Sequence, residues 1–256
     1  MTPRPRLLVL ASAVLLMAAT PFLARAAEFS APQRSEIETI VREYLIAHPE
    51  VLQDAMAELE NRQNAAQAEK GKTAVKQYSQ ALFTSPRQVT LGNHNGDVTF
   101  VEFFDYNCAY CKHAMGDMLT LLKDDPKLKI VLKEFPVLGP GSVEAAQVAV
   151  AVRMQDKTGK KYLEFHQKLL GGRGPADKAH ALAVAKEVGM DMTQIQKDMQ
   201  SPEVKATLEE NFKLAEALGL NGTPSYVIGD QVVVGAVGLP ALQKDINTAR
   251  CGKADC

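Results

Sequence analysis

Apolar residues recur at helical spacing near the start of the chain. The positions i, i+3, i+4, i+7 and i+8 of one short stretch hold Ile37, Ile40, Val41, Tyr44 and Leu45, which predicts a helix with one apolar stripe. Pro49 should end this helix and begin a second one, because proline disfavours helix at the residue before it and suits a first turn. The second stripe contains Val51, Leu52, Ala55, Met56 and Leu59.

The next stretch, residues 60–73, is rich in helix formers but contains no large apolar residue. Such a segment is typical of a spacer, and Gly71 offers a hinge. The two stripes before it bury little by themselves, so they either fold back on the rest of the chain or pack against copies of themselves. The polar spacer would hold these two helices away from the rest of the chain, which favours self-association. We expect residues 27–59 to form a helical oligomerisation segment and residues 60–74 a helical linker.

From residue 75 the pattern changes to short apolar strands that alternate with helices. Residues 87–91 and 98–104 have strand character and are separated by a turn with the signal Asn95-Gly96. A helix follows to about Leu122, and residues 128–135 form another strand. Strand, helix and strand at this spacing predict a βαβ unit with a parallel pair.

Residues 139–220 are wholly helical in pattern, and Ser142 is expected to cap a helix that is apolar all round. The last helix of this region should bury a face formed by Val204, Leu208, Phe212, Ala215 and Leu218. A hairpin of residues 225–228 and 231–234 and a closing helix of residues 239–249 complete the chain. This order predicts an α/β, thioredoxin-like fold over residues 75–256 with a helical insertion at about residues 139–220, preceded by the N-terminal α-helical oligomerisation segment.

The first residues of the chain predict the cellular compartment of the protein. The chain has 256 residues, 46% hydrophobic and 23% charged. Arg4 and Arg6 precede an apolar run, and Ala24-Arg25-Ala26 is a small-x-small cleavage site, so residues 1–26 are read as a signal peptide for export to the periplasm. The alternative is an uncleaved N-terminal anchor. With 29 basic and 30 acidic residues and no basic cluster, the chain is not expected to bind nucleic acid.

The candidate chemistry lies in the Cys-x-x-Cys of Cys108 and Cys111, where the strand of residues 98–104 passes into a helix. A thiol at a helix N-terminus faces unsatisfied N–H groups and the positive end of the dipole, which favour the thiolate. We expect Cys108 to be the exposed nucleophile and Cys111, on the apolar face with Met115 and Met118, the buried resolving thiol. This reading requires no cofactor and no metal.

Three ordered motifs resemble the DsbA family of exported thiol–disulfide oxidoreductases. They are residues 103–112, with sequence FFDYNCAYCK, residues 133–139, with sequence KEFPVLG, and residues 222–225, with sequence GTPS. The helices that contain residues 42 and 48–52 resemble the oligomerisation segment of ScsC-type proteins, a subgroup linked to copper tolerance. The resemblance covers roughly residues 75–249, and the ordered set of motifs is more specific than a lone Cys-x-x-Cys.

The resemblance implies roles for further residues. Thr223 and Pro224 would face the dithiol, with a cis bond into Pro224, and would pair with a substrate strand. Glu102 resembles the acid that accepts the proton of Cys111, with Lys133 as a possible charge partner; the alternative is a solvated glutamate. Tyr110, inside the motif, is a plausible substrate contact.

Neighbours of the motif are assigned smaller roles. Asp105 and Tyr106 are expected to shape the approach to the dithiol without taking part in the chemistry. His113 directly follows the motif and is expected to lie on the surface, outside the site.

A second pair, Cys251 and Cys256, lies at the end of the chain. In an exported protein the default is a small structural disulfide. The open alternatives are a copper(I)-binding tail, since soft thiolates suit copper(I), a redox relay, and four thiolates gathered around zinc.

These observations predict a periplasmic enzyme that exchanges disulfides with protein substrates. The oligomerisation segment favours a disulfide isomerase that works as a homo-oligomer, with a trimer favoured over a dimer, and a membrane redox partner would reset the dithiol. A link to copper tolerance is also expected. Two alternatives stay open: a monomeric DsbA-like dithiol oxidase, and an exported copper-binding protein that uses the cysteine pairs.

Overall fold

The computed structural model describes residues 29–256. The predicted signal peptide, residues 1–26, lies outside the described residues. The chain divides into two compact units, with the boundary between Glu58 and Leu59, and each unit is described by itself.

The first unit contains α1 (Ala31–Ala47) and the beginning of α2 (Pro49–Gln77). The backbone N–H of Ser30 donates to Oε1 of Gln33 over 2.9 Å at the start of α1, and Pro49 separates the two helices as predicted. No residue of α1 is buried. The apolar stripe is therefore open: Ile40 is 58% and Tyr44 54% exposed.

The second unit begins within α2, which continues as one helix to Gln77. Gly71 lies in this helix and is buried, and a Cβ added to it would come within 3.1 Å of Cγ2 of Val232. The expected hinge at Gly71 is therefore wrong: the missing side chain lets the helix approach the sheet closely. That residues 60–74 act as a linker stays a prediction.

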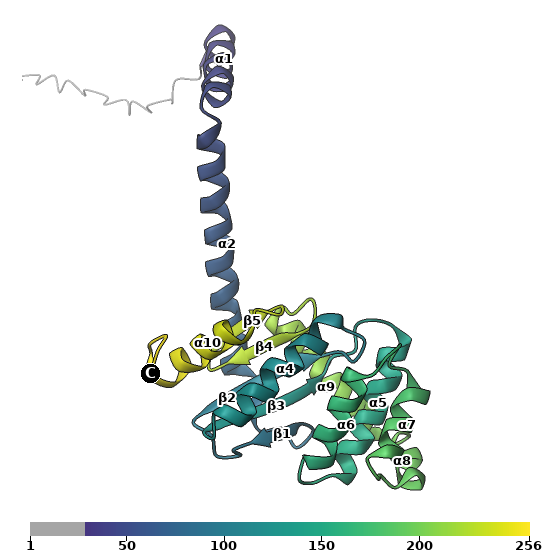
Figure 1. The fold of residues 1–256 in the computed structure, drawn as a ribbon. Helices are drawn as coiled ribbons and strands as arrows, with labels where there is room; N and C mark the ends of the chain where they lie inside the picture. Colours follow the sequence, from purple (N-terminus) through teal and green to yellow (C-terminus); the bar gives the residue numbers. More distant parts are fainter. Residues whose placement is uncertain (1–28) are drawn as a thin grey trace, which may run out of the picture. The chain divides into compact units, whose positions relative to one another are not determined.

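A five-stranded sheet forms the centre of the second unit, in the order β1-β3-β2-β4-β5 (Figure 1). The strands are β1 (Val89–Gly92), β2 (Val98–Phe104), β3 (Leu128–Glu134), β4 (Ser225–Ile228) and β5 (Gln231–Val234). Strands β2 and β3 are parallel, with Val101 opposite Val131, and the other pairs are antiparallel. The predicted βαβ unit is confirmed, with α4 (Ala109–Asp124) as its crossover helix.

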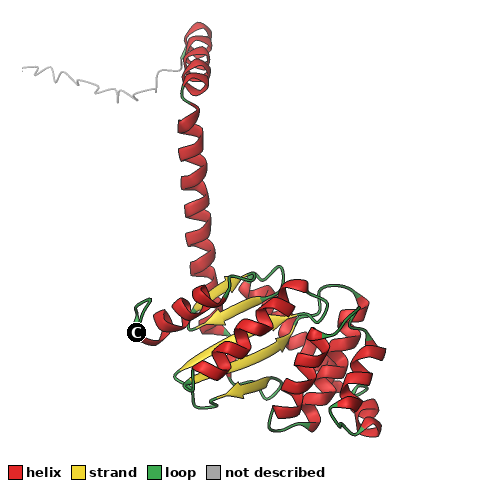
Figure 2. Ribbon diagram, viewed as in Figure 1, coloured by secondary structure: helices red, strands yellow, loops and turns green. Residues whose placement is uncertain are grey.

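Helices surround this sheet (Figure 2). Between β3 and β4 lie α5 (Pro140–Gln155), α6 (Lys160–Gly171), α7 (Lys178–Glu187), α8 (Met192–Asp198) and α9 (Pro202–Leu218); α3 (Ser79–Phe83) precedes the sheet and α10 (Leu239–Cys251) follows it. Helix α8 has no counterpart in the predicted pattern. The expected cap at Ser142 is wrong, because α5 begins at Pro140 after Gly139, and Ser142 is buried inside the helix.

The alternation along β2 divides the core between the two faces of the sheet. Phe100 and Phe104 belong to one apolar cluster with residues of α4, α6 and α10, whereas Val101 and Phe103 belong to another with residues of α2 and α9. Glu102 falls on the first face, since side chains two apart on a strand share a face. The strand thus directs one carboxyl into the layer that contains the helix of the dithiol.

Candidate active site

The dithiol lies where β2 passes into α4. Cys108 is the N-cap residue of α4 and Cys111 lies in its first turn, and both are free thiols. Cys111 has no exposed surface, which confirms it as the more buried thiol. Cys108 is only 5% exposed, so the expectation of an exposed nucleophile is wrong. Its Sγ lies 3.1 Å from the carbonyl oxygen of Thr223, and this loop covers it.

The covering loop contains the Thr223-Pro224 bond, which is cis as the resemblance implies. The carbonyl of Pro224 accepts a hydrogen bond from the N–H of Gly235 over 2.9 Å, and Oγ of Ser225 donates to the carbonyl of Gly222 over 2.7 Å. Residues about 115 positions apart in the sequence therefore meet at Cys108. The contact of Thr223 with substrate stays a prediction.

Glu102 lies on the central strand and is 2% exposed, so the alternative of a solvated glutamate is wrong. Within residues 29–256 its Oε2 has no hydrogen-bond partner. Burial, followed by the negative charge of Asp117, raises the pKa of Glu102 to about 8. The expected charge partner is also wrong: Nζ of Lys133 donates to the carbonyl of Ala81 over 2.9 Å. In the ladder Glu102 is opposite Leu132, so Lys133 points to the other face.

The resolving thiol is electrostatically linked to this carboxyl. Burial raises the pKa of Cys111 well above its ordinary value, and the charge of Glu102 raises it further. Cys111 thus holds its proton firmly, and deprotonation would require a base nearby. With a pKa of about 8, Glu102 is mostly protonated at neutral pH, and its ionised fraction is a stronger base than an ordinary carboxylate. That fraction can accept the proton of Cys111, because proton transfer is efficient when the pKa lies near the working pH.

Asp105 anchors the turn that carries the dithiol. It is 1% exposed, and its Oδ2 accepts the N–H groups of Val137 and Leu138 over 2.8 and 2.9 Å, while Oδ1 accepts that of Asn107 over 2.8 Å. The carbonyl of Asp105 accepts the N–H of Cys108 over 3.0 Å. One carboxylate therefore fixes the turn to the loop after β3.

Replacing Asp105 by alanine is expected to lower the free energy of unfolding by about 2–4 kcal/mol, because three backbone N–H groups lose their acceptor and burial blocks full replacement by water. Urea unfolding followed by circular dichroism measures the change. The exposed Asp124→Ala is the matched control, with an expected change within about 0.5 kcal/mol. Equal stabilities of the two variants would contradict this role of Asp105.

Asn107 is a site residue that the sequence interpretation missed. Its Nδ2 donates to Oγ of Ser142 and to the carbonyl of Ala176, each over 2.9 Å, and its Oδ1 accepts the N–H of Ala176 over 2.8 Å. The side chain thereby joins the turn before Cys108 to the helical insertion. An amide directly before a helix start was the available signal, since asparagine favours such positions.

Two other residues near the motif, Tyr110 and His113, are exposed. Tyr110 is 68% exposed, so its ring is open beside Cys108. Nδ1 of His113 lies 2.9 Å from the carbonyl of Ala109, within its own helix. The role of Tyr110 as a substrate contact stays a prediction.

Behind the turn lies a buried polar cluster. The hydroxyl of Tyr162 donates to Oε1 of Glu134 and lies 3.4 Å from the hydroxyl of Tyr106, which is 3.4 Å from Nδ1 of His166. Burial raises the pKa of Glu134 to about 8. Tyr106 therefore ties the active-site turn to α6, which agrees with a role in shaping it.

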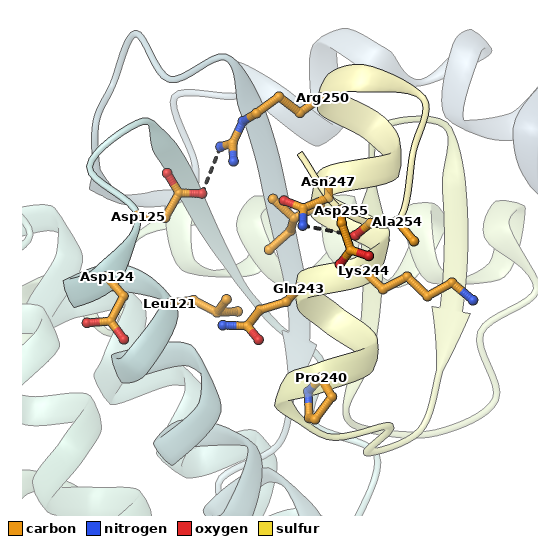
Figure 3. Close-up of a pocket in the computed structure, with 11 residues that line it drawn as sticks. Leu121, Asp124, Asp125, Pro240, Gln243, Lys244, Asn247, Arg250, Ala254 and Asp255 are labelled. Carbon is orange, nitrogen blue, oxygen red and sulfur yellow. Dashed lines mark hydrogen bonds and ion pairs between the residues drawn. The ribbon is translucent and has the colours of Figure 1, made fainter.

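Cys251 and Cys256 are joined in a disulfide, as the default interpretation predicts. Ala254 and Asp255, in the loop that this disulfide closes, line a pocket between the end of α4 and α10, where Arg250 makes a 2.7 Å ion pair with Asp125 (Figure 3). The dithiol lies at the other end of α4, which spans about 24 Å at ~1.5 Å per residue. The alternative of four thiolates around one zinc ion is therefore wrong, and this pocket is separate from the dithiol.

Comparison with known proteins assigns both parts of the chain. Residues 99–247 match the family model "DSBA-like thioredoxin domain", and residues 33–66 match "Copper resistance protein ScsC N-terminal domain". Within the described residues, no helix has the length and apolar character that a bilayer crossing requires.

Solved structures and curated proteins agree with this assignment. A thioredoxin-like oxidoreductase from Silicibacter pomeroyi DSS-3 is 46% identical, with a TM-score of 0.63, over 67% of this chain and 96% of that one. Proteus mirabilis ScsC in a transitional conformation is 26% identical, with a TM-score of 0.64, over 88% of this chain and 100% of that one. The "Probable disulfide bond formation protein D" of Bacillus cereus is 27% identical over 58% of this chain and 74% of its own length.

Other curated relatives are much longer proteins. The chain spans 21% of the length of the Na(+)/H(+) antiporter NhaA of Herminiimonas arsenicoxydans, to which it is 29% identical over 140 residues. The family model, in contrast, covers more than half of the chain and includes Cys108, Cys111 and Pro224. The chain belongs to the DSBA-like thioredoxin domain family and has a ScsC-type N-terminal segment before that domain.

Proposed function

We propose that this protein is a periplasmic thiol–disulfide oxidoreductase that acts on protein substrates through Cys108 and Cys111. The observation that carries the proposal is the position of Cys108, at the N-terminus of α4 and 3.1 Å from the Thr223 carbonyl. The loop of Thr223 and Pro224 lies against this sulfur, where an extended segment of the substrate would pair with it by strand addition. The family match supports the same chemistry.

The reaction begins when the Cys108 thiolate attacks one sulfur of a substrate disulfide. A bond forms between Cys108 and that sulfur, the substrate disulfide breaks, and the other substrate sulfur leaves as a thiolate. If Cys111 then attacks Sγ of Cys108, the mixed disulfide breaks, the substrate leaves reduced and the enzyme dithiol becomes oxidised. Glu102 receives the proton that Cys111 gives up. A membrane redox partner would reset the dithiol.

Isomerisation needs only the first half of this sequence. The released substrate thiolate attacks another disulfide of the same substrate, and a substrate thiolate finally displaces Cys108, so that no net electrons are transferred. Several active sites around one substrate favour this course, and the exposed stripe of α1 supports a homo-oligomer. We therefore propose an oligomeric disulfide isomerase, with a trimer favoured over a dimer and linked to copper tolerance. The alternative is a monomeric oxidase.

Charges placed in the stripe are expected to dissociate the oligomer. The double substitution Ile40→Glu and Tyr44→Glu removes two exposed apolar side chains and introduces like charges, so sedimentation velocity should show a monomer. Isomerisation of scrambled ribonuclease should fall by about tenfold or more, while oxidation of dithiothreitol should change by less than about twofold. Glu43→Lys, an exposed position on the face of α1 away from the stripe, is the control. A wild type that is monomeric at every concentration would refute the oligomer.

The alternative function, an exported copper carrier, is tested by copper(I) binding to the free thiols. Of the four cysteines only Cys108 and Cys111 are free thiols, since Cys251 is bonded to Cys256. Copper(I) titration of the reduced protein, with Cys108→Ser and Cys251→Ser variants, tests it. Tight stoichiometric binding without insulin reduction would favour the carrier over the enzyme.

A further inference from the structure

An apolar groove lies on the face of the second unit formed by α9 and the end of β3. Its apolar lining consists of Phe135, Val137, Phe212 and Leu220. The rings of Phe135 and Phe212 meet edge to face, with centroids 5.3 Å apart. Phe212 is 40% exposed, so its predicted place on the buried face of α9 is wrong. Val137 is also 41% exposed, and exposed apolar side chains that gather in one groove are typical of a surface that binds a partner.

Both sides of the groove continue into the loops that surround Cys108. On one side, the N–H groups of Val137 and Leu138 donate to Asp105, whose carbonyl accepts the N–H of Cys108. Leu138, the residue after Val137, is 53% exposed and adds a second exposed apolar side chain to this loop. On the other side, Thr223 comes three positions after Leu220 in the sequence, and its carbonyl contacts Cys108. A chain bound at the dithiol can therefore continue into the groove.

The polar side of the groove is formed by α9. Glu209, Lys213 and Glu216 line it, and all three are exposed. Two acidic groups against one basic group leave a negative edge. Glu209 also lies 3.6 Å from Lys205, outside the groove, so Glu216 is the carboxylate that we choose to test. An apolar segment with a basic side chain is complementary to this surface in both respects.

We propose that this groove binds an apolar stretch of the protein substrate next to the cysteine that reacts with Cys108, and that it prefers a basic residue in that stretch. The inference rests on the proposed function, because its occupant is the substrate of the dithiol. It assigns substrate specificity to Phe212 and Glu216, which lie outside the Cys-x-x-Cys and the cis-proline loop. An unfolded protein exposes such apolar stretches, whereas a small thiol has none.

The test compares two peptides with the same pair of cysteines. In one peptide leucine, phenylalanine and lysine flank the cysteines on both sides, and in the other serine, glycine and glutamate do so. The oxidised full-length protein oxidises each peptide, and the loss of free thiol gives kcat/KM; dithiothreitol serves as the small substrate. The wild type should prefer the apolar, basic peptide by about tenfold, and Phe212→Ser should reduce this preference to about twofold. The rate with dithiothreitol should stay within about twofold.

The charged residue is tested with a matched pair of variants. Glu216→Lys should lower kcat/KM for the lysine-containing peptide by about threefold or more, whereas Glu164→Lys, the same charge change on α6 outside the groove, should leave it within about 1.5-fold. Since both glutamates are exposed, neither substitution is expected to disturb folding.

The outcomes distinguish failure of the groove proposal from failure of the proposed dithiol chemistry. A wild type that does not oxidise dithiothreitol would refute the proposed function. If it oxidises dithiothreitol but does not distinguish the peptides, or if Phe212→Ser keeps the full preference, the groove proposal is overturned and the dithiol chemistry stands. A change of oligomeric state in Phe212→Ser, with the peptide preference intact, would also overturn it, because the groove would then be an interface between copies.

Discussion

Replacing Cys108 by serine is expected to lower the rate of dithiol oxidation by at least about a thousandfold. Exchange requires a sulfur that can attack, or be attacked, within a disulfide, and a serine hydroxyl can do neither. Cys111 cannot take over, because it has no exposed surface and holds its proton firmly. Insulin reduction in the presence of dithiothreitol and direct oxidation of a dithiol peptide both measure the loss.

The second cysteine pair supplies the control for this prediction. The double variant Cys251→Ser and Cys256→Ser removes the C-terminal disulfide but not the dithiol at the other end of α4. Its rate should stay within about twofold of the wild type. If this variant loses activity as completely as Cys108→Ser does, the C-terminal pair takes part in exchange, and the redox-relay alternative replaces the structural one.

Replacing Glu102 by leucine is expected to stabilise the fold in a pH-dependent way. The pKa of this buried carboxyl is about 8 in the folded protein, against an ordinary value of 4.5. Below pH 4.5 the carboxyl is protonated in both the folded and the unfolded chain, so its ionisation does not change the free energy of unfolding. Between pH 4.5 and 8 the unfolded chain releases the proton while the folded chain keeps it, so the wild type loses stability as the pH rises.

The leucine variant lacks this loss, so its advantage should grow from pH 4.5 to 8 and then stay constant. At about 1.4 kcal/mol for each unit of pKa shift, the difference amounts to a few kcal/mol near pH 8. Urea unfolding at pH 4, 6 and 8 measures it, and the exposed Glu164→Leu is the control. The pKa of Glu134 is also about 8 and adds the same trend to both proteins. A Glu102→Leu advantage that is equal at pH 4 and pH 8 would contradict the assignment.

The same substitution should slow catalysis. Without this carboxyl the Cys111 proton loses its proposed acceptor, so resolution of the Cys108 mixed disulfide near neutral pH should slow by about 10- to 100-fold. Rapid quenching by acid, which traps the mixed disulfide, gives this rate. Glu102→Gln, which keeps the shape of the side chain but cannot accept the proton, should be equally slow. A stabilised Glu102→Leu variant with an unchanged rate would make Glu102 a buried group without a role in proton transfer.

Several interpretations from sequence failed for one physical reason. Cys108 is covered because the loop of Thr223 and Pro224, far away in sequence, lies against it. Lys133 was paired with Glu102 as a neighbour on the next strand, but the register opposes Glu102 to Leu132 and turns Lys133 to the other face. Phe212 has the helical spacing of a buried residue, yet its ring packs against Phe135, from a distant segment, and stays 40% exposed.

The position of the dithiol, the βαβ unit around it and the closing hairpin were predictable from sequence alone. Each depends on periodicity and turn chemistry within a few residues: β2 and both strands of the hairpin have the predicted bounds. The tertiary structure alone decided which groups face one another. It placed Thr223 on Cys108, left Glu102 without a counter-charge among the described residues, and opened the groove beside Phe212. Such facts depend on contacts between distant segments, and local propensity contains no information about exposure or strand register across them.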